Sequence, residues 1–183
     1  MIIDVLVNNA GVSYRGTMQD LQPAEVSAMI TLNIGALTRL THALIPQMVA
    51  RGKGKILNVS SVTAFQPVPS LSVYAASKAF VLSLTEALSE DLKGTGVTAT
   101  ALCPGLTKTE MVDELVQDEP IPSYMIASAD DVAREAYDAL MKGEVVRVPG
   151  IANQFAVNWV KYQPRWLVRN LGGMFARLQT KKT

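Results

Sequence analysis

Residues 58–78 decide the fold, and they read Asn-Val-Ser-Ser-Val-Thr-Ala-Phe-Gln-Pro-Val-Pro-Ser-Leu-Ser-Val-Tyr-Ala-Ala-Ser-Lys. An apolar strand over residues 55–59 leads into this stretch and ends at a pair of serines. A loop with two prolines follows, and a helix then begins that carries Tyr74 and Lys78. Their i,i+4 spacing puts the phenol and the ammonium on one face of the helix. We therefore expect the pKa of the Tyr74 phenol to fall towards the range in which it exchanges protons.

The second serine of the pair, Ser61, stands at the carboxyl end of the strand. From there its hydroxyl can donate a hydrogen bond to the same substrate oxygen that the phenol serves. A tyrosine and a lysine four residues apart also occur by chance in many helices. The alternatives are therefore an ordinary half-buried tyrosine at Tyr74 and a solvated helix charge at Lys78.

The composition narrows the classes of protein. The 183 residues fit one domain with a sizeable core, and a net charge of +1 argues against a nucleic-acid binder that relies on bulk charge. Cys103 and His42 are the only residues of their kinds, which excludes an internal disulfide and a Cys/His zinc site and favours a reducing compartment. No run approaches about 18 apolar residues and no basic leader precedes an apolar stretch, so we expect neither a membrane span nor a signal peptide.

Two further motifs flank the central stretch. An apolar run over residues 2–7 ends at Asn8-Asn9-Ala10-Gly11, and a strand over residues 97–102 leads into Pro104-Gly105-Leu106-Thr107-Lys108-Thr109. With Ser61 and Tyr-x-x-x-Lys, these motifs make residues 4–148 resemble the short-chain dehydrogenase/reductase family. The resemblance implies an α/β fold: part of a Rossmann-type, doubly wound parallel sheet with helices on both faces.

The resemblance also implies an activity, the NAD(P)-dependent reduction of a carbonyl or oxidation of an alcohol in a small molecule. Tyr74 would be the acid/base, and Lys78 would lower its pKa and bind the nicotinamide ribose. Ser61, thirteen positions before Tyr74 as is usual in the family, would hold the substrate oxygen in preference to Ser60. Asn33, in a long helical segment that precedes them, would hold a water of the proton relay; the alternative is a buried asparagine that satisfies a local kink.

The implied cofactor is NADP or NAD, with NADP favoured. Asn8, Ala10 and Gly11 would line its adenosine side, while Asn9 would hold the strand ends together. Tyr74 and Lys78 would contact the nicotinamide half, and the loop with Pro104, Gly105, Thr107 and Thr109 would close over it. Without the resemblance, both motifs are ordinary turns that end strands.

The C-terminal part differs from the rest. After a mixed segment over residues 112–128, which we interpret as a mobile substrate loop, a helix to about residue 141 and a last strand over 145–148 complete a domain of residues 1–149. Residues 150–183 form a basic, amphipathic extension in which aromatic and aliphatic side chains alternate with Lys and Arg. Such a segment predicts contact with an anionic membrane surface or a cover over an apolar pocket, and the alternative is a helix packed on its own domain.

The sequence has no Thr-Gly-x-x-x-Gly-x-Gly turn, which in the family opens the half that anchors the cofactor pyrophosphate. We expect the strand near Val5 to lack a neighbour and to form an apolar edge. Three hypotheses remain open. The first is a cytoplasmic enzyme that forms a homodimer or homotetramer and can associate with a membrane. The second is a truncated, non-catalytic remnant that acts only through dimerisation with intact relatives, and the third is a protein whose true start lies upstream.

Overall fold

The computed structural model describes residues 2–108 and 126–170. Four parallel strands form one sheet in the order β1-β2-β3-β4, with bounds Val5–Asn8, Gly54–Val59, Val97–Leu102 and Val146–Arg147. Each strand pairs with the next one along the chain, so every connection is a crossover that must pass over a face of the sheet. Helices supply these crossovers.

The first crossover is a continuous helical stretch made of α1 (Pro23–Met29), a π-helical turn η1 (Ile30–Ala36) and α2 (Leu37–Ala50). It begins as the sequence predicts, because Pro23 occupies the first turn and the Glu25 carboxylate accepts the Gln22 backbone N–H at 2.8 Å. Among the described residues, only Pro23–Ala50 has the length and mean hydropathy, 1.2, of a membrane span. In this fold Met29 and Met48 of that stretch are fully buried in the domain, while 22% of its apolar window as a whole is buried.

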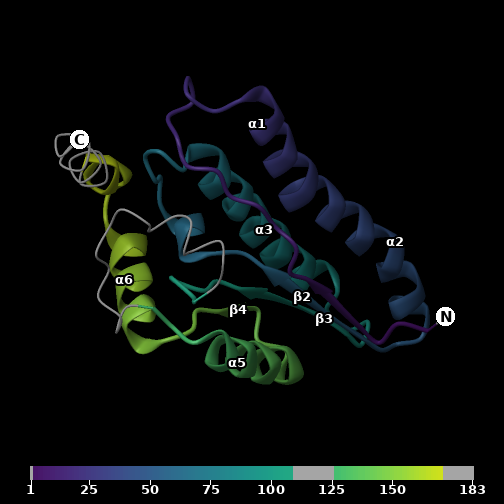
Figure 1. Cartoon of the computed structure of the whole chain (residues 1–183). Coiled ribbons are helices and arrows are strands. Elements are labelled where there is room, and N and C mark those ends of the chain that lie inside the picture. The colour runs from purple at the N-terminus through teal and green to yellow at the C-terminus, as the bar shows by residue number, and fades with distance from the viewer. Residues whose placement is uncertain (1, 109–125, 171–183) are drawn as a thin grey trace.

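The other crossovers use η2 (Val62–Phe65) with α3 (Ser72–Asp91), and then α5 (Ala129–Lys142). Figure 1 shows α2 and α3 over one face of the sheet and α5 over the opposite face. The Ser128 hydroxyl caps α5 by accepting the Asp131 N–H, and Gly143 ends it in the left-handed conformation. The partial Rossmann-type sheet with helices on both faces is thus confirmed.

Strand alternation sorts the core into two layers. In β2, Ile56 packs with Met48 and Val97 on the α2 and α3 side, while its neighbour Leu57 packs with Leu140 on the α5 side. The strand is buried on both faces, which explains why the neighbouring residues Ile56 and Leu57 are both apolar.

β1 differs from that pattern. It lies at the edge of the sheet, as expected. An apolar run such as residues 2–7 suits a strand that is buried on both faces, but here only one face of β1 is buried. Val5 and Val7 are 44% and 51% exposed, because α5 lies over β2 and β3 and does not reach this face of β1. The opposite face, with Leu6 and Asn8, packs against α2.

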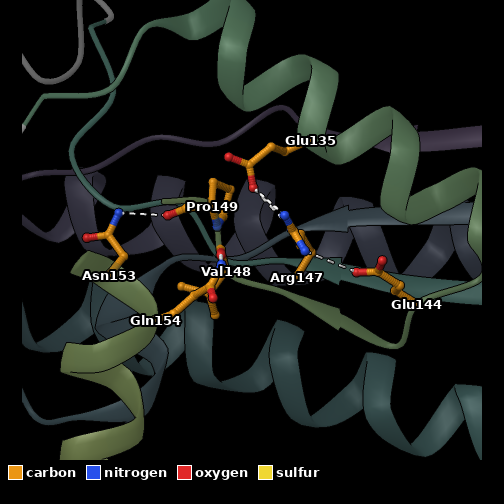
Figure 2. Close-up of polar contacts among 7 residues, drawn as sticks. All are labelled: Glu135, Glu144, Arg147, Val148, Pro149, Asn153 and Gln154. Atoms are coloured by element: carbon orange, nitrogen blue, oxygen red, sulfur yellow. Dashed lines mark hydrogen bonds and ion pairs between the residues drawn. The ribbon is translucent and has the colours of Figure 1, made fainter. Parts of the chain in front are cut away.

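After β4 the chain turns at Gly150, whose φ of 79° suits glycine, and forms α6 (Ile151–Tyr162). Figure 2 shows how the start of α6 is fixed: the Asn153 and Gln154 side-chain amides donate to the Pro149 and Val148 carbonyls, each at 2.9 Å. Arg147 secures the same corner by an ion pair to Glu135 at 2.8 Å and a longer one to Glu144 at 3.7 Å.

Candidate active site

The expected site residues come from the carboxyl ends of β1, β2 and β3 and from the helices that follow. This edge of a parallel sheet is where α/β proteins place their ligands. The structure brings Asn33, Ser61, Tyr74 and Lys78 together there, with Gly11 beside them.

Tyr74 and Lys78 lie on the inner side of α3, one turn apart. The Lys78 ammonium is 5.6 Å from the centroid of the Tyr74 ring and donates to the Val59 carbonyl at 2.9 Å. Burial of the amine, which is only 5% exposed, lowers the pKa of Lys78 to about 8.

The direction expected for Tyr74 is wrong in this structure. Burial of the half-buried phenol raises its pKa above the ordinary value, and a hydrogen bond with the Ser61 side chain only partly offsets that rise. The i,i+4 spacing correctly puts the ammonium near the ring, but desolvation by the surrounding fold outweighs it. The phenol is therefore a stable proton donor here.

The two serines have different partners. The Ser60 hydroxyl donates to the Lys78 carbonyl at 2.7 Å and its N–H donates to the Leu102 carbonyl, so Ser60 ties strand ends to α3. Ser61 begins η2 by accepting the Thr63 N–H at 3.2 Å, and it faces the Tyr74 phenol. Ser61 is thus the serine that can share a substrate oxygen with Tyr74.

Asn33 is 1% exposed and lies in the π-helical turn η1. Its amide oxygen accepts the Val12 N–H and its amide nitrogen donates to the Val12 carbonyl, both at 2.9 Å, and to the Ser77 hydroxyl at 3.1 Å. Ser77 donates in turn to the Tyr74 carbonyl. Asn33 therefore holds the loop after β1 against the helix of Tyr74, and π-helical turns of this kind are frequent at functional sites.

In the Asn-Asn-Ala-Gly motif after β1, the roles expected for the two asparagines are not the ones the structure shows. Asn8, not Asn9, joins the strand ends: its amide donates to the Thr41 hydroxyl at 3.0 Å and to the Asn58 side chain at 2.8 Å. Asn58 donates onwards to Thr85 at 2.9 Å, which completes a buried polar chain across β1, β2 and both helices. Asn9 and Ala10 are exposed at the sheet edge.

Position 11 requires glycine, because a side chain would not fit there. A Cβ at this position would lie 3.2 Å from the Asn33 amide oxygen and 3.3 Å from the Lys78 ammonium, which is closer than nearly all real contacts. The backbone of this motif thus approaches the Tyr74–Lys78 pair directly, and a ligand on the sheet edge would touch both.

The loop after β3 lies beside this group. The Pro104 carbonyl accepts the Val62 N–H at 3.0 Å, and the segment 106–108 pairs with Ala127 through two backbone hydrogen bonds. Thr107 donates to the Gly105 carbonyl at 3.3 Å. Thr109 and most of the expected substrate loop lie outside the described residues.

Two further residues, Asn153 and Cys103, lie near this loop. Asn153 of α6 packs on Gly105 so closely that a Cβ there would meet its amide at 2.6 Å, a contact without any signal in the spacing of the sequence. Cys103 is fully buried, and burial raises the pKa of its thiol to about 12, which fits the predicted inert, hydrophobic role.

Part of a nicotinamide cofactor fits these residues. The glycine approach at Gly11, the Lys78 ammonium and the Pro104–Thr107 loop lie along one sheet edge, where the ribose and nicotinamide of such a cofactor would bind. A glycine-rich turn that would hold a pyrophosphate is not among the motifs of this sequence.

Comparisons with known proteins give the same picture. The family model of short chain dehydrogenase matches residues 2–120. The ketoacyl reductase HetN of Nostoc sp. is 42% identical over 103 residues, which cover 56% of this chain and 36% of the relative. The chain spans 36–55% of the length of four curated relatives that it matches.

Solved structures match most of the described fold. A short-chain dehydrogenase from Sphingobium yanoikuyae in complex with NADPH superposes with a TM-score of 0.77 at 31% identity, covering 97% of this chain and 65% of that protein. A gluconate 5-dehydrogenase from Burkholderia cenocepacia, in complex with NADP and tartrate, gives 0.75 at 28% identity, covering 84% and 65%. Both neighbours hold a nicotinamide cofactor with a 2′-phosphate.

Proposed function

This chain belongs to the short-chain dehydrogenase family, and from that premise we propose that it takes part in the NAD(P)-dependent reduction of a carbonyl or oxidation of an alcohol in a small molecule. The observation that carries the proposal is the convergence of Tyr74, Ser61 and Lys78 at one sheet edge. NADP is favoured over NAD because the neighbours at high TM-score hold NADP or NADPH.

In the proposed reduction, the bound cofactor supplies a hydride to the carbonyl carbon. Ser61 donates a hydrogen bond to the carbonyl oxygen and orients it towards Tyr74. The Tyr74 phenol then gives its proton to that oxygen, which becomes the alcohol hydroxyl. Lys78, held by the Val59 carbonyl, keeps a positive charge near the phenolate that forms, and Asn33 fixes the backbone on which Tyr74 stands.

We assign cofactor binding to eight of the described residues: Asn8, Ala10, Gly11, Tyr74, Lys78, Pro104, Gly105 and Thr107. Gly11 and Gly105 contribute through close backbone approach rather than through side chains. The Asn8 side chain is already committed to Thr41 and Asn58, so its contribution would come from its backbone. Thr109 is retained in this proposal from the sequence motif alone.

The test is Tyr74→Phe. We expect NADPH-dependent turnover of a panel of aldehydes and ketones to fall by at least about 100-fold, since general-acid catalysis contributes that much, while NADPH binding followed by fluorescence and the circular dichroism spectrum stay unchanged. Tyr137→Phe is the control, because Tyr137 is an exposed tyrosine on α5. Equal turnover of the Tyr74→Phe protein and the wild type would overturn the assignment.

A second candidate is a subunit that acts only through pairing with intact relatives. The outer surface of the helical stretch and of α3 favours pairing, because Ile30, Leu40 and Phe80 are 48%, 51% and 40% exposed. The same surface supports a homodimer or homotetramer of the enzyme. A folded wild-type chain that binds no NADPH, yet forms a stable complex with a full-length relative, would favour this candidate over the enzyme.

We also propose peripheral contact of α6 with a membrane. Its outer face carries Ile151, Phe155, Trp159 and Tyr162, which are 73%, 73%, 50% and 85% exposed. Their spacing of four, four and three residues keeps them on one side of the helix, opposite the buried Val157. These four residues are called the outer stripe below.

A further inference from the structure

A cavity of about 840 Å³ lies on the side of α3 that faces away from the candidate active site. Its walls come from α3, from η2 and the loop after it, from the end of α6 and from the helical residues 165–169. The lining is mainly apolar and includes Phe65, Val68, Ala76, Ala79, Val160 and Val168. This volume lies within the range of pockets that bind small molecules.

The helix geometry separates this cavity from the Tyr74 site. Ala76 lies two residues after Tyr74 and two before Lys78, so its Cβ points about 200° around the helix from each of them. A ligand that touches Ala76 therefore lies behind α3, where the proposed hydride transfer does not reach. The cavity is a second site, and its occupancy does not depend on the proposed hydride transfer. It adjoins the surface proposed for pairing, because Phe80 lies one turn after Ala76 on the same face of α3.

The charges at the rim are of one sign. Lys161, Arg165 and Arg169 line the cavity, and no aspartate or glutamate is among the described residues of its wall. Within the described ranges none of these three cations has an ion-pair partner; the Lys161 ammonium lies 4.8 Å from the centroid of the Phe65 ring. Residues 150–183 contain six basic residues and no acidic one, whereas the chain as a whole has a net charge of only +1.

We propose that this cavity binds an anionic amphiphile with a single hydrocarbon chain, of which a fatty carboxylate is the simplest example. The hydrocarbon chain would lie along the small side chains of α3, where it removes apolar surface from water. The carboxylate would lie at the rim between Arg165 and Arg169, whose guanidinium groups suit a planar two-oxygen anion. The hydrocarbon chain thus contacts apolar surface, and the carboxylate contacts side chains of opposite charge.

The first measurement is the uptake of the fluorescent fatty acid cis-parinaric acid by the full chain, with displacement by laurate or by lauryl alcohol. We expect saturable uptake, displaced by laurate at a concentration about tenfold lower than by the alcohol, because one charge-assisted contact is worth that factor or more. Ala76→Trp should abolish uptake by filling the cavity from an exposed helix position. Ala133→Trp, which adds the same side chain at an exposed alanine of α5 outside the cavity, is the matched control.

The second measurement tests the rim. The double variant Arg165→Glu and Arg169→Glu should weaken laurate binding at least about tenfold and leave the affinity for the alcohol unchanged. Arg134→Glu, an exposed arginine of α5 outside the cavity, controls for the change in net charge. The Tyr74→Phe protein should bind laurate as the wild type does, so loss of catalysis and loss of this site are separable.

Three results would overturn the proposal. Uptake that Ala76→Trp and the double variant leave unchanged would place the fatty acid elsewhere. Uptake lost in Phe155→Ser but kept in Ala76→Trp would assign it to the outer stripe. A change of oligomeric mass in Ala76→Trp by light scattering, together with absence of laurate binding to the wild type, would make the cavity part of an interface between copies of the chain.

Discussion

Lys78 is the residue whose environment differs most from what its position in the sequence indicates. The spacing to Tyr74 predicts a pair in which the ammonium lowers the pKa of the phenol. In the fold both groups lose solvent, and burial moves their pKa values apart, that of Lys78 down and that of Tyr74 up. Spacing along a helix shows which side chains meet, but desolvation is set by tertiary packing that spacing does not contain.

The pKa of Lys78 makes stability depend on pH. Its folded value of about 8 lies below its ordinary value of 10.5, so below pH 8 both states are protonated and the buried charge destabilises the fold by a constant amount. Between these two values the unfolded chain binds more protons than the folded one, and stability rises with pH. Relative to Lys78→Met, the unfolding free energy of the wild type should gain about 3 kcal/mol over this window.

Urea unfolding of both proteins between pH 7 and pH 10.5 measures this difference. Tyr74 and Cys103 also titrate with raised pKa values. Both proteins carry them, so only their coupling to Lys78 remains in the difference. Lys142→Met removes the same charge at an exposed site and serves as the control. A difference between wild type and Lys78→Met that does not change with pH would contradict the burial argument.

At the scale of elements, the sequence predicts regular segments well and the π-helical turn not at all. Hydrophobic spacing and caps predict a helix over about residues 73–92, a helix that is capped by Ser128 or Asp130 and ends near residue 141, and a strand over 97–102. α3, α5 and β3 agree with these predictions because the signals are local. η1 has no such local signal. It accompanies the hydrogen bonds of Asn33 to Val12, twenty-one residues away, and only the folded chain brings these two residues together.

The sequence leaves open whether residues 150–183 form a helix packed on its own domain or a membrane-binding segment. α6, which begins this extension, has features of both. One face is anchored through Val157, Asn153 and Gln154, while the outer stripe faces solvent. Trp and Tyr favour the interface between water and lipid, and the lack of acidic residues after residue 149 suits an anionic surface.

We expect the full chain to float with vesicles that contain phosphatidylglycerol and to stay in the bottom fraction with pure phosphatidylcholine. The double variant Phe155→Ser and Trp159→Ser should lower the partition coefficient for these vesicles at least about tenfold. Burial of each aromatic side chain in the membrane contributes about 1.5–3 kcal/mol to binding. Tyr137→Ser, an exposed aromatic residue of α5, is the control. Equal flotation of the stripe variant and the wild type would exclude α6 as the contact.

At the scale of the whole molecule, the resemblance correctly predicts the order of the motifs, the parallel sheet and the position of β1 at an edge. It could not predict how little covers β1, because coverage depends on where α5 ends over the sheet. Along β1, Val5 and Val7 form an apolar strip beside backbone groups that have no neighbouring strand among the described residues. Such an edge is a template for pairing with other chains.

Val7→Lys should therefore slow aggregation of the 183-residue chain. A lysine at an exposed edge position repels a second edge and leaves the core intact, so the unfolding free energy should change by less than about 0.5 kcal/mol. Light scattering over time at fixed concentration measures the rate, and the urea midpoint measures stability. Val49→Lys adds the same charge at a 37% exposed valine on α2 and separates a local effect on the edge from a general effect of net charge. If both variants slow aggregation equally, net charge rather than the β1 edge controls self-association; if only Val7→Lys does, the uncovered edge is the surface through which copies of this fold meet.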